Sequence, residues 1–125
     1  MKSKDQIKSE LAQFTGTEEY HRFSPLFRNV LLTDGALYLA EECGAYWFMD
    51  VIASHLPSVT EDHFAIAILT KTEGDKAFFT LQDDVPFKAL FARQSIKFTD
   101  FPLDEIKLYV IRDGEHWVIL LPSEY

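Results

Sequence analysis

The stretch that decides the fold runs from Thr33 to Pro57 and reads TDGALYLAEECGAYWFMDVIASHLP. Apolar residues and one glycine recur in it at helical spacing: Leu37, Ala40, Gly44, Trp47, Val51 and Ile52. Four more residues widen this stripe, so we expect burial on most sides: Ala36, Cys43, Phe48 and Leu56. Thr33 or Asp34 is suited to cap a helix, and Pro57 ends it. The sequence therefore predicts a central helix over Asp34–Leu56.

Gly44 qualifies this helix, because a glycine inside a helix costs about 1 kcal/mol relative to alanine. It indicates either close packing or a break into two helices. Upstream, Ile7, Leu11 and Phe14 share one face of a predicted helix over Ser3–Phe14 that Ser3 caps. The segment Tyr20–Thr33 contains Pro25, so we expect irregular structure with a short strand or turn near Arg28–Leu32.

After Pro57 the pattern changes to runs of β-branched and aromatic residues bounded by turn residues. The runs are His63–Lys71, Lys76–Gln82, Ala89–Phe98, Ile106–Arg112 and Trp117–Pro122. Helices followed by consecutive strands are typical of α+β folds. We predict one domain over residues 1–125, with the N-terminal helices packed on one face of a four- to five-stranded antiparallel meander. Its open edge strand is one that a homodimer could use.

The composition agrees with one compact domain, since 125 residues with 47% hydrophobic side chains supply a core. The N-terminus MKSKDQIKSEL lacks the apolar region of a signal peptide. Asp50 and His55 interrupt the best candidate for a membrane span. The single cysteine, Cys43, excludes an intramolecular disulfide. We therefore expect a cytoplasmic protein with no membrane contact.

The charges are unevenly distributed: twenty acidic residues face twelve basic ones, and the net charge is −8. No Lys or Arg occurs from Asn29 to Thr70. Binding to phosphate backbones needs clustered Lys and Arg, so we expect no nucleic-acid partner. An acidic face could meet a basic protein or a cation, or serve only solubility.

No catalytic or metal constellation stands out. Cys43 follows Glu41 and Glu42, whose charges raise rather than lower a thiol pKa, so packing is its expected role.

The best candidate set of metal ligands consists of His55, Glu61, Asp62 and His63. It is a weak candidate, because a solvated loop explains these residues equally well. The paired carboxylates Glu41–Glu42, Asp83–Asp84 and Asp104–Glu105 are adjacent in the chain and cannot face each other as glycosidase pairs do. We expect no metal and no cofactor.

Two other features could bind a ligand or partner. Gly35 lies in the first turn of the central helix, where free amides bind anions, but the Asp34 charge beside it favours capping. Tyr46, Trp47 and Phe48 fan over about 200° on a helix and cannot all face one core. We expect core packing for Trp47 and Phe48, whereas Tyr46 serves either a structural hydrogen bond or a surface contact.

Several stretches resemble a family of small bacterial proteins of unknown function, often carried on plasmids and other mobile elements. They are QFTGTE (Gln13–Glu18), TDGALYLAEECGAYWFMDVI (Thr33–Ile52), TDFPLDEI (Thr99–Ile106) and LPSEY (Leu121–Tyr125). The family has no assigned activity, so no residue inherits a role. The resemblance names residues worth mutating: Thr33, Asp34, Tyr46, Trp47, Asp50, Glu124 and Tyr125. We expect the LPSEY tail either to dock on the body or to be presented to a partner.

The favoured hypothesis is a non-catalytic accessory or protein-binding module that acts through an acidic, aromatic-containing surface. The alternative is a small-molecule binder or small enzyme with a pocket between the helix 34–56 and the sheet, lined by Asp34, Tyr46 and Asp50, with His21 or His55 as the titrating group. The candidate binding residues are Asp34, Tyr46, Trp47, Asp50 and His55. An acidic mimic of DNA is the weakest hypothesis, because regular carboxylate rows are missing.

Overall fold

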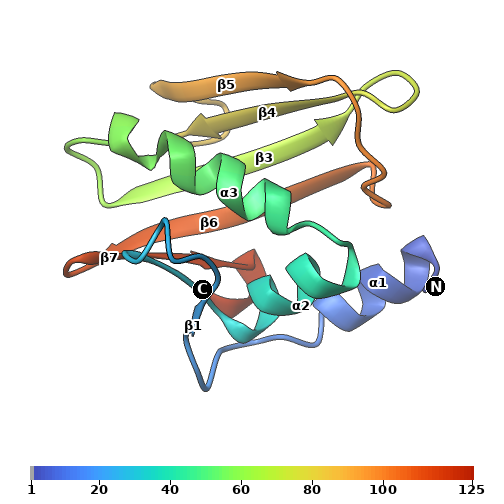
Figure 1. The fold of residues 1–125 in the computed structure, drawn as a ribbon, viewed down its shortest axis with the longest axis horizontal. Helices are drawn as coiled ribbons and strands as arrows, with labels where there is room; N and C mark the ends of the chain where they lie inside the picture. Colours follow the sequence, from blue (N-terminus) through green and yellow to red (C-terminus); the bar gives the residue numbers. More distant parts are fainter. Residues whose placement is uncertain (1) are drawn as a thin grey trace.

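The computed structural model describes residues 2–125, which form three helices and one seven-stranded mixed sheet (Figure 1). The helices are α1 (Lys4–Leu11), α2 (Asp34–Glu42) and α3 (Tyr46–His55), and the short 3-10 helices are η1 (Leu56–Ser58) and η2 (Pro122–Glu124). The strands are β1 (His21–Arg22), β2 (Val30–Leu32), β3 (Phe64–Lys71), β4 (Ala77–Gln82), β5 (Leu90–Ile96), β6 (Glu105–Asp113) and β7 (His116–Leu120). The predicted α+β class is confirmed.

The predicted antiparallel meander of four to five strands is wrong in strand number, order and direction, because the sheet has seven strands. The sheet order is β1-β2-β7-β6-β3-β4-β5, and β2 pairs with β7 in parallel. Because β6 pairs with β3 rather than with β5, β5 is left at the edge of the sheet. The sequence pattern missed β1 because a strand of two residues is too short to show alternation. β2 does fall inside the predicted short strand or turn near Arg28–Leu32.

The predicted helix over Asp34–Leu56 is two helices, so the alternative of a break at Gly44 is confirmed. Gly44 has φ +58°, a left-handed conformation that favours glycine. The amide of Ala45 donates to the carbonyl of Ala40 over 2.8 Å, and the amide of Gly44 donates to the carbonyl of Glu41 over 3.4 Å. These two bonds form a Schellman motif, the usual way in which a glycine ends an α-helix.

The core lies between the helices and one face of the sheet, with α3 running across the strands in Figure 1. The Phe48 ring is fully buried and meets the edges of Phe79 and Phe101, at centroid distances of 5.9 and 6.4 Å. At the N-terminus, Ile7 and Leu11 bury α1 in this core, and the Ser3 hydroxyl caps α1 by accepting from the amide of Gln6. Apolar side chains at helical spacing thus pack α1, α2 and α3 against a common core.

No α-helix packs on the other face of the sheet within residues 2–125, and loops, η2 and the chain end cover part of it. Val118 and Leu120 of β7 are buried there although they lie outside the main core. The rings of Phe64, Tyr109 and Tyr125 cluster on this face with centroid distances of 5.1 to 5.8 Å. The LPSEY tail therefore docks on the body. No helix in the described part of the chain is long and apolar enough to cross a membrane.

Candidate functional site

The parallel pair β2–β7 brings together two segments that are far apart in the sequence. Parallel strands end on the same side of a sheet. β2 leads directly into α2 at Thr33, and β7 leads into η2, which carries Glu124. The Thr33 amide donates to the carbonyl of Ile119 over 3.1 Å and so extends the pairing by one residue. Residues about 90 positions apart in the chain consequently meet at the start of α2.

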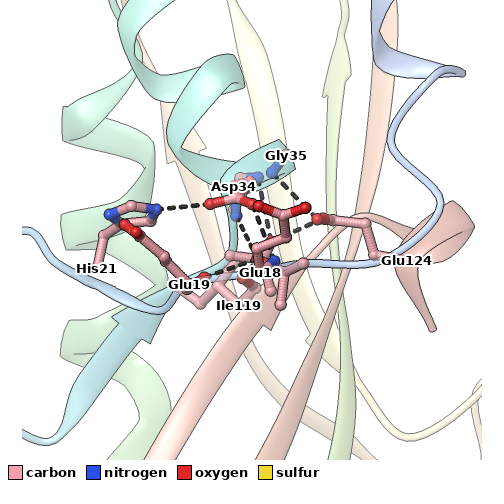
Figure 2. A network of polar contacts seen from close by, with 10 residues as sticks. Glu18, Glu19, His21, Asp34, Gly35, Ile119 and Glu124 are labelled. Carbon is pink, nitrogen blue, oxygen red and sulfur yellow. Dashed lines mark hydrogen bonds and ion pairs between the residues drawn. The ribbon is translucent and has the colours of Figure 1, made fainter.

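The Glu124 carboxylate binds the first turn of α2 (Figure 2). Its Oε1 accepts from the Thr33 hydroxyl over 2.6 Å and from the Leu121 amide over 2.9 Å. Its Oε2 accepts from the Gly35 amide over 3.1 Å. The Thr33 hydroxyl in turn accepts from the Ala36 amide. A carboxylate near the C-terminus thus accepts a hydrogen bond from a free amide of the first turn of α2. Its negative charge also interacts favourably with the positive end of the helix dipole.

Gly35 is required for this close approach. A Cβ atom at position 35 would lie 2.5 Å from Oε1 of Glu124 and 2.6 Å from Cδ1 of Leu121, which is itself buried. The sequence predicted that Asp34 supplies the charge beside these amides. Instead Glu124 occupies the position next to the Gly35 amide, and the Asp34 side chain turns toward His21.

Asp34 fastens β1 and the loop that precedes it to the same helix end. Its Oδ1 lies 2.7 Å from Nε2 of His21, and its Oδ2 accepts from the Glu18 amide over 3.0 Å. The Asp34 amide donates to the Thr17 hydroxyl over 2.9 Å. The hydrogen bond from His21, followed by that from the Glu18 amide, holds the pKa of Asp34 below its ordinary value. This carboxyl therefore stays ionised well into the acidic range.

We call the set of Thr17, Glu18, His21, Thr33, Asp34, Gly35, Leu121 and Glu124 the α2 junction. It joins three of the stretches that carry the family resemblance: QFTGTE, the start of TDGALYLAEECGAYWFMDVI, and LPSEY. Its hydroxyl and carboxylate groups bond one another, and no buried side-chain polar atom of residues 2–125 lacks a partner. Groups engaged in this way hold the three segments together at the start of α2.

A pocket of about 250 Å³ opens beside the α2 junction on the sheet face that carries no helix. Its lining combines three junction residues with apolar residues of β6 and β7 and three further side chains: Thr17, Thr33, Glu124, Ile111, Val118, Leu120, Tyr20, Arg112 and Asp113. Tyr20 is exposed at its rim. The sequence missed this pocket because its walls come from both ends of the chain.

The other predicted site residues lie on α3, beyond the opposite end of α2. Tyr46 is 39% exposed, Asp50 is exposed, and Trp47 is half-buried. The Tyr46 hydroxyl donates to Oε1 of Glu41 over 3.2 Å. Burial, together with the nearby Glu41 charge, raises the pKa of Tyr46, so the hydroxyl remains protonated. Asp34 lies at the start of α2, whereas Tyr46 and Asp50 lie on α3, which follows the end of α2. The structure therefore does not bring these three side chains together.

His55 lies where α3 meets β5, with Nε2 2.8 Å from Oε1 of Gln94. Its ring stacks on Phe79 at a centroid distance of 5.7 Å. Across residues 2–125 no three His, Cys, Asp or Glu side chains converge as metal ligands, so the sequence neighbours Glu61, Asp62 and His63 do not form a site with it. Packing against Phe79 and bonding to Gln94 account for His55.

Two local contacts modify the expectations for Cys43 and for the acidic stretch. Cys43 is buried, and burial, with a smaller effect of Glu42, raises its pKa to about 11. Lys2, which precedes α1, lies 2.8 Å from Glu10 and 3.8 Å from Glu42 and so partly neutralises the acidic surface of α2. Glu41 and Asp50 form no ion pair within residues 2–125. Free negative charge therefore gathers around Tyr46.

The chain belongs to a family of unknown function, DUF6876, whose model matches residues 5–125. No curated protein matches the chain. No solved structure matches it either. The family relationship thus covers nearly the whole chain and assigns no activity to it.

Proposed function

We propose that this member of the family is a non-catalytic module of the bacterial cytoplasm that binds a basic protein through the outer surface of α2 and α3. We call this surface the acidic face and define it as Glu41, Tyr46, Trp47 and Asp50. The observation that carries the proposal is the exposed Tyr46 ring between two carboxylates that form no ion pair in the described chain.

The geometry of α3 supports this proposal. Tyr46 and Asp50 are four residues apart, so they lie one turn apart on the same side of the helix. Trp47 is half-buried and adds an apolar surface beside them. Exposed aromatic rings are common anchors of interfaces, and unpaired acidic groups around them attract and orient a basic partner. The segment from Asn29 to Thr70 contains no Lys or Arg, so it has no positive charge that would repel a basic partner.

The test compares affinity capture by the wild-type protein with capture by Tyr46→Ala and Asp50→Lys. Extract from the bacterial host is passed over each immobilised protein at 150 mM salt, and retained proteins are identified by mass spectrometry. Glu115→Lys is the matched control, because Glu115 is an exposed acidic residue in the turn between β6 and β7. We expect one basic protein to bind the wild type and the control and to be lost from both acidic-face variants.

Direct calorimetry with that purified protein then gives the affinity of each variant. An exposed aromatic anchor contributes about 2 kcal/mol, so Tyr46→Ala should weaken binding about thirtyfold. Equal retention by all four proteins, or retention of nothing by the wild type, would refute the proposed function.

A second candidate function, small-molecule binding, rests on the pocket beside the α2 junction. This pocket is lined by apolar side chains together with several polar groups, a combination found in ligand sites. A thermal-shift screen against metabolites tests it, because a ligand at 100 times its Kd stabilises by about 2.7 kcal/mol. A true ligand should lose its effect in Tyr20→Ala. Absence of any stabilising compound counts against this candidate.

A further inference from the structure

β5 forms one edge of the sheet and pairs only with β4 (Figure 1). It is seven residues long and contains no proline. An edge strand of this length leaves a row of backbone N–H and C=O groups without strand partners. Most of its side chains are half-buried or exposed, and no other strand or helix lies beyond it in the sheet order.

Exposed apolar side chains concentrate around this edge. Nine large apolar residues of the described chain are exposed, and five of them lie between positions 78 and 98: Phe78, Val85, Phe87, Leu90 and Phe98. A pocket of about 360 Å³ lies where β4 starts and β5 ends, lined in part by Phe78 and Ile96. Scattered exposed apolar residues need no explanation, but a group at a free edge indicates a binding surface.

The charge of this edge is opposite to that of the whole protein. Residues 76–98 carry the four basic side chains Lys76, Lys88, Arg93 and Lys97, against the two acidic residues Asp83 and Asp84. None of the four basic groups forms an ion pair within residues 2–125. The Asp83 carboxylate accepts from the amides of Lys88 and Ala89, which engages it in the turn. Residues 76–98 therefore carry a net charge of +2.

Alternation along the strand places this charge on one face. Arg93 lies opposite Thr80 and Ser95 opposite Phe78, so both residues point to the face without helices. Lys97, two residues after Ser95, continues the same row. An added strand with acidic residues at alternate positions would face Arg93 and Lys97, while its backbone bonds to β5.

We propose that the β5 edge binds an extended acidic segment of another protein as an eighth strand. The positive charge selects this occupant over a second copy of the chain, because two copies edge to edge would oppose Arg93 and its flanking lysines to one another. A charged edge also prevents indiscriminate pairing. This surface is separate from the acidic face, so the protein would hold a basic and an acidic partner at the same time.

The test is an NMR titration of the ¹⁵N-labelled full chain with a capped eight-residue peptide that alternates glutamate and valine. We expect amide shifts confined to β5 and its flanks, residues 88–98, with binding that weakens several-fold between 25 and about 150 mM salt as screening increases. The matched peptide with lysine in place of glutamate should not bind. Shifts at β5 with the acidic peptide alone support the proposal.

Charge reversal provides the second arm. Arg93→Glu should lose the acidic peptide and gain the lysine peptide, whereas Arg28→Glu, at an exposed basic residue outside the sheet, should behave as the wild type. Circular dichroism verifies that both variants fold. The proposal is overturned by the absence of β5 shifts at 2 mM acidic peptide, by equal binding of both peptides, or by concentration-dependent β5 shifts without peptide, which would identify a second copy as the occupant.

Discussion

Replacement of Gly35 by alanine tests the α2 junction directly, because the expected sign is opposite to that of an ordinary helical glycine. Inside a helix, alanine is about 1 kcal/mol more favourable than glycine. At position 35, however, the new Cβ would lie 2.5 Å from Oε1 of Glu124 and 2.6 Å from Cδ1 of Leu121. The Glu124 carboxylate and the end of the Leu121 side chain must therefore shift away from the first turn of α2.

The cost follows from the bonds that Glu124 would lose. A buried hydrogen bond to a charged group stabilises the fold by about 1.5–3 kcal/mol. Because Glu124 is half-exposed and screened by solvent, we assign about 1 kcal/mol to each of its bonds to Thr33 and Gly35. Displacement of the buried Leu121 side chain adds about 1 kcal/mol. After subtraction of the alanine gain, Gly35→Ala should destabilise the protein by about 2 kcal/mol. For a domain of this size, the Tm should fall by roughly 8 °C.

Urea unfolding followed by circular dichroism measures this difference. Gly16→Ala is the matched control, since no atom lies within 4 Å of its added Cβ, and its stability should change by less than about 0.5 kcal/mol. In a Glu124→Ala background the cost of Gly35→Ala should shrink, with a coupling of about 1 kcal/mol. A Gly35→Ala protein as stable as the wild type would refute the close approach of Glu124 to α2.

Three further predictions concern single positions. Asp34→Asn should destabilise at pH 7: because the folded pKa of Asp34 is lowered, its contribution is complete above the ordinary value of 3.8 and is lost as the pH falls through the lower folded value. The difference between wild type and Asp34→Asn in urea unfolding should thus shrink toward pH 2.5, and a constant difference contradicts the His21 contact. Gly44→Ala should cost about 1 kcal/mol, because φ is +58° and alanine avoids that conformation, while Gly44→Asn should cost less in the same assay. Cys43 should react with a disulfide reagent at pH 8 at least about 100-fold more slowly in the folded protein than in urea, since burial leaves roughly one thiol in a thousand ionised at a pKa of about 11; comparable rates would show an accessible thiolate.

Local patterns in the sequence located most of the secondary structure. Ser3, and either Thr33 or Asp34, were expected as helix caps, and Ser3 and Thr33 accept the capping hydrogen bonds. Strands of five residues or more were all found, since alternation and turn residues act over short distances. The sequence left two explanations for Gly44, close packing inside one helix or a break between two helices. Only the structure distinguishes them, because the apolar spacing around the glycine is the same in both cases.

The candidate site could not be assembled from the sequence in the same way. Thr33, Asp34 and Glu124 were singled out through the family resemblance, but their contacts were not. Glu124 reaches Gly35 only because β2 and β7 pair in parallel, and β2 is too short to show a strand pattern. His21 was considered as a titrating group, while its partner Asp34 lies 13 residues away across a loop.

The apolar stretch from Thr33 to Pro57 by itself determined that this part of the chain is helical, because helical periodicity and capping are properties of neighbouring residues. Strand order, the parallel pair β2–β7 and the free edge at β5 were decided by the tertiary structure alone. Which strands pair depends on which distant segments of the chain bury their apolar surfaces against each other, and a local sequence pattern does not contain this information. The α2 junction and the proposed β5 surface both follow from it.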